Sequence, residues 1–246
     1  AQSVDQHTSS YKAFEWPDDL PEDAWWISPD LLSVHGTPQE TQLTEQQLKR
    51  LSKWECINFF SLNINGEREL LQELYKRIHF PEYGLVSEYF HHIAGEENEH
   101  MWFFATFCNK YGGKIYPDRI LRLPGHAVPP DIELFSLFAR ILIFEEIVDY
   151  FNTRMSRDTA IIPFVSKINA VHHQDESRHI IFGRQMVRDL HATIKKRYTK
   201  QEVDRIADYL KRFIVASMQA VYNPLVYEDA GIAEPFKFRA ALLRDE

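Results

Sequence analysis

Four stretches of this chain carry apolar residues at helical spacing, and each apolar stripe contains one glutamate. Residues three and four positions apart lie on the same face of an α-helix, so each glutamate would point toward the same interior as its apolar neighbours. A buried carboxylate without a partner is strongly destabilising. The pattern therefore predicts four helices packed around a shared polar centre, to which they contribute Glu67, Glu97, Glu145 and Glu176.

Turn and capping residues delimit the expected helices. Thr44 and Gln47 form a capping-box pattern at the start of the first helix, and Thr199 and Glu202 repeat it at the start of a fifth. Gly112 is a stop signal for the second helix, and a crossover rich in proline and glycine is expected before the third. The helices expected from these signals span about residues 44–79, 85–111, 130–157, 163–197 and 199–222.

The first part of the chain lacks helical periodicity. Its prolines stand in turn-like contexts, and Trp16, Trp25 and Trp26 are suited to anchor an extended segment on a neighbouring surface. We therefore expect residues 1–43 to form an irregular N-terminal arm packed on the bundle, and residues 44–246 to form one helical domain.

Composition narrows the class of protein. The 246 residues are 44% hydrophobic with only 9 glycines, as in a helix-rich globular protein. The net charge of −8 argues against a nucleic-acid partner. Cys56 and Cys108 form no disulfide framework. No basic-then-apolar leader or run of membrane-spanning length is apparent, so we expect a cytoplasmic protein that does not enter the membrane.

Two of the four glutamates are followed by a histidine three residues later. The segments Glu97-x-x-His100 and Glu176-x-x-His179 each place a carboxylate and an imidazole on one helix face. Dinuclear iron and manganese bundles combine two such segments with one glutamate from each of two further helices. Glu67 and Glu97 lie at similar distances along the chain from the turn between their helices, and so do Glu145 and Glu176. In antiparallel neighbouring helices, each pair would therefore lie at the same height in the bundle. We therefore predict a site for two metal ions, iron in preference to manganese, rather than a purely structural bundle.

Other acidic residues and histidines compete for these positions. Glu55 and Glu69 are alternatives to Glu67 on the first helix, and Glu146 is an alternative to Glu145 on the third. His91 and His92 are interpreted as ordinary polar residues, and His173 is expected to point away from the site.

His172 adds a third imidazole to the predicted site. It precedes Glu176 by four residues, about one helical turn, and lies on the same face as Val165 and Ile168. A buried imidazole held only by hydrogen bonds is the alternative interpretation.

This set of residues resembles the ferritin-like di-iron oxygenases, and specifically the p-aminobenzoate N-oxygenase (AurF-like) family. The third histidine, four residues before the last ligand glutamate, is the specific part of the resemblance. The resemblance implies an all-α, ferritin-like four-helix bundle with a fifth helix and the irregular arm. It also implies an O2-dependent enzyme that oxidises the nitrogen of an aromatic amine to a hydroxylamine or nitro product through a peroxo di-iron species.

The resemblance further implies a distribution of ligands between two iron ions. Glu67, Glu97 and His100 would hold one ion, and the second would be held by Glu145, His172, Glu176 and His179. Asp175 and Glu96 would orient ligand histidines from outside, with Asp175 accepting a hydrogen bond from His100. The expected partners are a small-molecule amine, O2 and an electron donor, with a homodimer allowed. The alternatives are a di-iron hydroxylase or desaturase, which the third histidine disfavours, and a ferritin-like ferroxidase.

Overall fold

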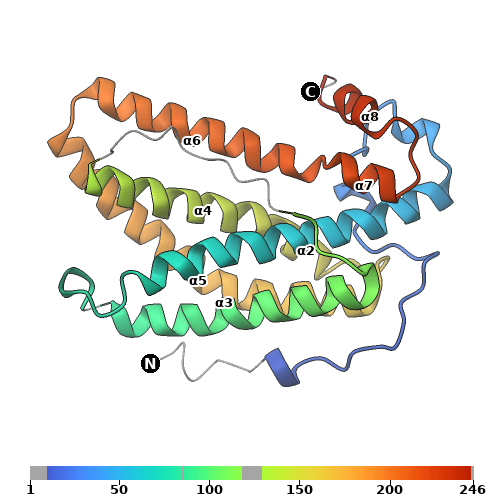
Figure 1. Ribbon diagram of the computed structural model, residues 1–246, viewed down its shortest axis with the longest axis horizontal. Helices are drawn as coiled ribbons and strands as arrows, with labels where there is room; N and C mark the ends of the chain where they lie inside the picture. Colours follow the sequence, from blue (N-terminus) through green and yellow to red (C-terminus); the bar gives the residue numbers. More distant parts are fainter. Residues whose placement is uncertain (1–9, 85, 118–128, 245–246) are drawn as a thin grey trace.

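The computed structural model of the protein describes residues 10–84, 86–117 and 129–244 (Figure 1). Helices dominate these ranges and no strand occurs within them, which confirms the all-α prediction. Within the same ranges, no helix has both the length and the apolar character needed to cross a lipid bilayer. Most of the predicted crossover, residues 118–128, lies outside the described part of the chain.

Four long helices form the bundle. They are α2 (Glu45–Tyr75), α3 (Ser87–Phe107), α4 (Pro130–Met155) and α5 (Pro163–Arg197). α2 packs along α3 and α4 packs along α5, each as an antiparallel pair. In Figure 1, α2 and α5 run in one direction, while α3 and α4 run in the opposite direction. The predicted bundle is therefore present, and the relative direction of its helices decides which site residues lie side by side.

The predicted helix ends are accurate to within a few residues. Thr44 and Thr199 form complete capping boxes at the starts of α2 and α6, because each hydroxyl accepts from the third residue of its helix while that side chain bonds back. α2 ends at Tyr75, earlier than predicted. α3 continues into a short π-helical segment, Cys108–Gly112, and Gly113 with φ 67° ends it in the left-handed conformation that favours glycine.

The C-terminal helices cover one side of the bundle. α6 (Lys200–Val221) lies across α4 and α2 (Figure 1). α7 (Pro224–Asp229) folds back against α2, and α8 (Pro235–Leu242) packs against α7. α6 has a strongly amphipathic pattern, and its apolar face closes over the groove between α2 and α4.

The N-terminal arm is irregular apart from three short 3-10 turns and is held against the bundle by specific contacts. Trp26 is 1% exposed, and its backbone N–H donates to Ser52 Oγ at 3.1 Å. The backbone N–H and hydroxyl of Ser33 donate to the buried carboxylate of Glu55 at 3.0 and 2.5 Å. The backbone carbonyl of Trp25, the residue before Trp26, accepts a hydrogen bond from the backbone N–H of Ile162 at 2.9 Å. These contacts place the arm beside the start of α5.

Candidate metal centre

Seven acidic and imidazole side chains converge inside the bundle, and none is more than 6% exposed. α2 and α4 each contribute one of them, α3 contributes two and α5 contributes three. The seven residues are those predicted from the sequence: Glu67, Glu97, His100, Glu145, His172, Glu176 and His179.

The ligand atoms fall into two groups, each within 4.8 Å: Glu67 with His100 and His172, and Glu97 with Glu176 and His179. The carboxylate of Glu176 reaches both groups. Its Oε1 lies 3.2 Å from His100 Nδ1 and 2.9 Å from His172 Nε2, while its Oε2 lies 3.2 Å from His179 Nδ1. Glu176 is therefore positioned between two metal-binding positions.

Glu97 has the same double orientation. Its Oε2 lies 3.3 Å from His100 Nδ1 and its Oε1 lies 2.9 Å from His179 Nδ1. Glu145 is in neither group of ligand atoms, but it lies close enough for the charges of Glu176 and Glu97 to act on it, and it lines a small cavity together with His179. The carboxylates of Glu97 and Glu176 thus lie in the middle of the centre. Glu67 lies on the side of His100 and His172, and Glu145 lies on the side of His179.

The predicted position of His172 was wrong. The sequence interpretation placed it with Glu145 and His179, whereas its Nε2 lies 3.4 Å from Glu67 Oε1, in the group that contains His100. The reason is the direction of the helices. α3 and α5 are antiparallel, so a residue after Glu97 and a residue before Glu176 lie toward the same end of the bundle.

Several buried atoms of the centre lack hydrogen bonds of acceptable geometry with any described residue. They include both carboxylate oxygens of Glu67, Glu97 Oε1, Glu176 Oε1 and His172 Nε2. Buried polar atoms without partners are rare in native proteins, and these all belong to residues of the two groups of ligand atoms. A set of carboxylates and imidazoles without a thiolate suits iron or manganese. The residues present therefore fit a pair of such ions.

Protons neutralise the centre when no cation is present. Burial raises the pKa of Glu67 to about 7, and burial together with the nearby charges of Glu176 and Glu97 raises the pKa of Glu145 well above its usual value. Burial also opposes the charge of Glu176, but His179 and His172 outweigh it and hold the pKa of Glu176 well below the usual value. Metal binding must displace these protons, so metal affinity at this centre depends on pH.

A chain of charged residues on α3 and α5 holds the outer nitrogens of two histidines. His100 Nε2 lies 3.2 Å from Asp175 Oδ2, and His179 Nε2 lies 2.8 Å from Glu96 Oε2. Arg178 joins the two carboxylates, because it donates to Asp175 at 2.6 Å and to Glu96 at 2.7 Å. The contact predicted between Asp175 and His100 is present, whereas the sequence did not single out Arg178.

Asn152 is a site residue that sequence reasoning missed. It is fully buried on α4, and its side-chain amide lies 2.8 Å from His172 Nδ1. The amide oxygen has no partner among the described residues. If His172 Nε2 binds a metal, Nδ1 carries the proton, and turning the amide by 180° lets its oxygen accept that proton. A signal was available, since Asn152 follows Glu145 by seven residues, two helical turns along the same stripe.

The competing residues are engaged elsewhere. Glu55 binds Ser33 in the arm, Glu69 pairs with Arg140 at 2.9 Å, and Glu146 pairs with Arg184 at 2.6 Å. His173 lies against Asp149, and His91 lies against His79. None of these residues belongs to either group of ligand atoms.

The fold and the centre together define a ferritin-like dinuclear carboxylate protein, with glutamates from two helices and Glu-x-x-His segments from two others. The model of the family described as p-aminobenzoate N-oxygenase AurF matches residues 1–246, and the chain belongs to this family. The protein is therefore an oxygenase with a helical-bundle, di-iron type of architecture. No significant match was found among curated proteins or among solved structures.

Proposed function

We propose that the protein uses two iron ions and O2 to oxidise the nitrogen of an aromatic amine to a hydroxylamine, and by further rounds to a nitro group. Membership of the N-oxygenase family supports the reaction class. The observation that carries the proposal is the convergence of seven buried acidic and imidazole side chains, four of which have polar atoms without a hydrogen-bond partner among the described residues.

Each residue has a distinct place in this proposal. Glu67, His100 and His172 would hold one ion, Glu145 and His179 would hold the other, and the carboxylates of Glu97 and Glu176 would lie between them. The four carboxylates carry a charge of −4, which balances two divalent cations. When bound, the two irons would supply the electrons that reduce O2 and allow transfer of an oxygen atom to the amine.

The protein's own residues orient the imidazoles and exclude water. Asp175 and Glu96 keep the protons of His100 and His179 on their outer nitrogens, which leaves the inner nitrogens free to bind metal. Buried phenylalanine rings pack against two of the histidines. The ring centroid of Phe104 lies 4.9 Å from that of His172, and the ring centroid of Phe103 lies 5.5 Å from that of His100. An apolar wall of this kind limits access of bulk water to the reacting groups.

An external electron donor is part of the proposal, because successive oxidations of one amine need the metal pair to be reduced again. The small-molecule amine and O2 are the other reactants. We propose iron over manganese on the basis of the family, and a homodimer is compatible with the proposal.

Metal content and amine oxidation test the proposal together. After anaerobic reconstitution with ferrous iron, elemental analysis should find about two iron ions per chain. Addition of O2 and a reductant with p-aminobenzoate should then give hydroxylamine and nitro products detectable by mass spectrometry. Fewer than one iron per chain would overturn the metal assignment, and O2 consumption with iron oxidation but no amine product would indicate a ferroxidase instead.

A matched pair of variants on α4 controls for nonspecific damage. Glu145→Ala should lose about one iron ion per chain, because it removes a terminal ligand. Glu146→Ala should keep both ions, because that side chain is exposed and pairs with Arg184. Equal iron content in the two variants would contradict the ligand role of Glu145.

A further inference from the structure

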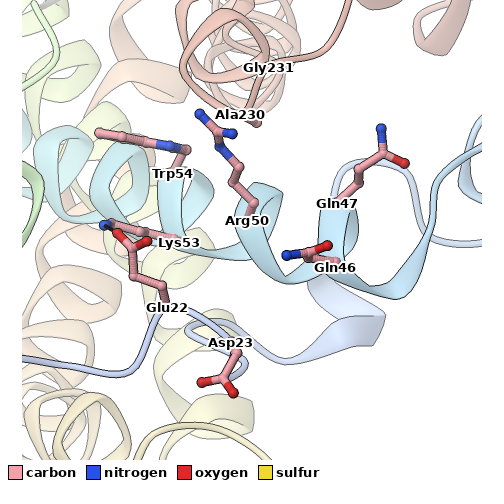
Figure 2. Close-up of a pocket in the computed structure, with 9 residues that line it drawn as sticks. All are labelled: Glu22, Asp23, Gln46, Gln47, Arg50, Lys53, Trp54, Ala230 and Gly231. Carbon is pink, nitrogen blue, oxygen red and sulfur yellow. Dashed lines mark hydrogen bonds and ion pairs between the residues drawn. The ribbon is translucent and has the colours of Figure 1, made fainter.

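Two large hollows on the described part of the protein surface differ in their relation to the metal centre. The first, of about 550 Å³, lies between the arm, the start of α2 and the turn after α7 (Figure 2). Its charged groups already have partners: Lys53 pairs with Glu22 at 2.7 Å, and Arg50 donates to the backbone of Asp229 at 3.3 Å. None of the residues that line it belongs to the metal centre.

The second hollow is a groove of about 500 Å³ between α2, α4 and α6. One wall is apolar and largely aromatic, and a polar edge on the opposite side includes Arg68, Glu69 and Arg140. An aromatic wall beside a few charged groups is typical of a site for a small ring-containing molecule. The apolar wall includes Phe59, Leu62, Phe144, Ile147, Phe151 and Phe213.

Shared lining residues relate the groove to two smaller cavities beside the metal centre. A small cavity of about 50 Å³ shares Gly66, Arg140 and Phe144 with the groove and is also lined by Glu145. Beyond it, a further cavity of about 30 Å³ is lined by Glu145 together with His179. The groove and the two cavities thus form a series in which each space shares lining residues with the next, and Glu145 of the centre lines both cavities.

Phe144 stands at the junction between the groove and the centre. Its ring occupies the place where a side chain at position 66 would be, since a Cβ there would lie 2.3 Å from ring atom Cε1. Gly66 is thus required for this close approach. Gly66 and Phe144 directly precede Glu67 and Glu145 in the sequence. Both line the groove and also the small cavity that Glu145 lines.

On the histidine side of the centre, hydrogen-bond partners occupy the outer nitrogens. The outer nitrogens of the three histidines are engaged by Asp175, Glu96 and Asn152. The side formed by α2 and α4 contributes only Glu67 and Glu145 to the centre. A substrate can therefore reach the metal positions from the α2–α4 side without displacing the hydrogen bonds that hold the imidazoles.

Arg140 supplies a positive charge at the inner end of the groove. Its Nη1 donates to Glu69 at 2.9 Å, but its Nε is buried without a partner among the described residues. The guanidinium lies 5.8 Å from the ring centroid of Phe213 on α6. Because the Glu69 side chain is 53% exposed, it can move aside while an incoming anion takes its place. A guanidinium beside aromatic rings suits an anionic substituent on an aromatic molecule.

We propose that this groove is the substrate-binding site, that Phe144 controls passage from it to Glu67 and Glu145, and that Arg140 binds an anionic substituent of the amine. The chemistry of the bound molecule rests on the proposed function, whereas the location of the site rests on the cavities and on the contact between Phe144 and Gly66.

Calorimetric binding of p-aminobenzoate and its neutral analogue p-aminobenzamide tests the role of Arg140. The titrations use the metal-free protein and the anaerobic iron-loaded protein. Arg140→Gln should weaken binding of the acid roughly 10–100-fold, the effect of a lost charge-assisted hydrogen bond, and leave binding of the amide unchanged. Arg188→Gln, at an exposed position on α5, should change neither. Equal affinities of wild-type protein and Arg140→Gln for the acid would overturn this part.

The gate is tested with amines of different size. Phe144→Ala should allow oxidation of a two-ring amine such as an aminonaphthoate, which the wild-type protein should exclude. Phe144→Leu, a smaller change that preserves packing, should give an intermediate result. Phe236→Ala, at a 69% exposed position on α8, should behave as wild type. Circular dichroism confirms folding of each variant, and an unchanged size limit in folded Phe144→Ala would overturn the gate.

These outcomes separate the groove from the reaction. Arg140-dependent binding of p-aminobenzoate without its oxidation would support the groove and overturn the proposed function. Oxidation of p-aminobenzoate that is insensitive to changes at Arg140 and Phe144 would support the function and overturn the groove.

Discussion

Asp175 on α5 and Glu96 on α3 each hold a histidine that belongs to the opposite helix. Asp175 contacts His100 on α3, and Glu96 contacts His179 on α5. Arg178 donates to both carboxylates and closes the connection. The imidazoles of the centre are therefore oriented by a link between helices, so a change in one outer carboxylate affects the packing of α3 against α5 as well as one imidazole.

Asp175→Asn tests this link. An amide accepts a weaker hydrogen bond than a carboxylate and cannot pair with Arg178 as an ion, so His100 should be held less firmly. We expect iron affinity to fall roughly 10–100-fold, as is typical for outer-shell partners of metal ligands. Competition with a chelator measures the affinity. Asp189→Asn, at an exposed position on the same helix, is the control, and equal iron affinities in the two variants would contradict the role of Asp175.

Asn152 is expected to fix the orientation of His172 through its amide oxygen. Asn152→Asp retains an acceptor and should keep two iron ions per chain. Asn152→Leu has similar size but leaves the Nδ1–H of His172 buried without a partner, and its affinity for one of the two ions should fall roughly 10-fold or more. Stepwise iron titration distinguishes the two ions. Indistinguishable titrations of the Leu and Asp variants would show that Asn152 does not position His172.

Glu55 should make stability fall as pH rises. Burial raises its pKa to about 7, against 4.5 in an unfolded chain, although Ser33 partly opposes this shift. The folded state binds this proton more tightly than the unfolded state. The contribution of Glu55 to stability is therefore fully present below pH 4.5 and is lost progressively up to about pH 7. The loss attributable to this residue is about 3 kcal/mol.

The difference between wild-type protein and Glu55→Gln isolates this effect from the titrations of the metal centre. Urea unfolding at pH 5 and pH 7.5 should give a smaller pH dependence for the variant, because glutamine stays neutral at both values. Parallel pH profiles for the two proteins would show that Glu55 has an ordinary pKa.

Removal of the metal ions should lower the melting temperature. Metal ions at 100 times their dissociation constant stabilise the folded state by about 2.7 kcal/mol for each site. For a chain of this size this corresponds to roughly 5–10 °C for each site. Differential scanning calorimetry before and after dialysis against a chelator measures the shift. Glu97→Ala, which lacks a carboxylate shared by both groups, should show a much smaller shift, and an unchanged melting temperature in wild-type protein would argue against metal binding in the bundle.

The sequence predicted which side chains are buried together at the centre, because charged residues interrupt regular apolar patterns. A glutamate inside an apolar stripe is conspicuous, and capping boxes at Thr44 and Thr199 mark where two helices begin. The grouping of His172 was not predictable from stripes alone, since it depends on which helices run antiparallel. The partner of Glu55 was also hidden, because Ser33 lies in an irregular segment where periodicity carries no information.

The two Glu-x-x-His segments lie on the antiparallel helices α3 and α5. His172 precedes Glu176 by four residues, and the residue in the equivalent place before Glu97 is Ile93. Ile93 is 4% exposed and lines the small cavity beside Glu145 and His179. The imidazole of His172 thus has a hydrocarbon side chain, that of Ile93, as its counterpart on the other helix. The two metal positions are therefore chemically unequal, and the position beside Ile93, with fewer protein donors, is the one left with more room for an exogenous ligand.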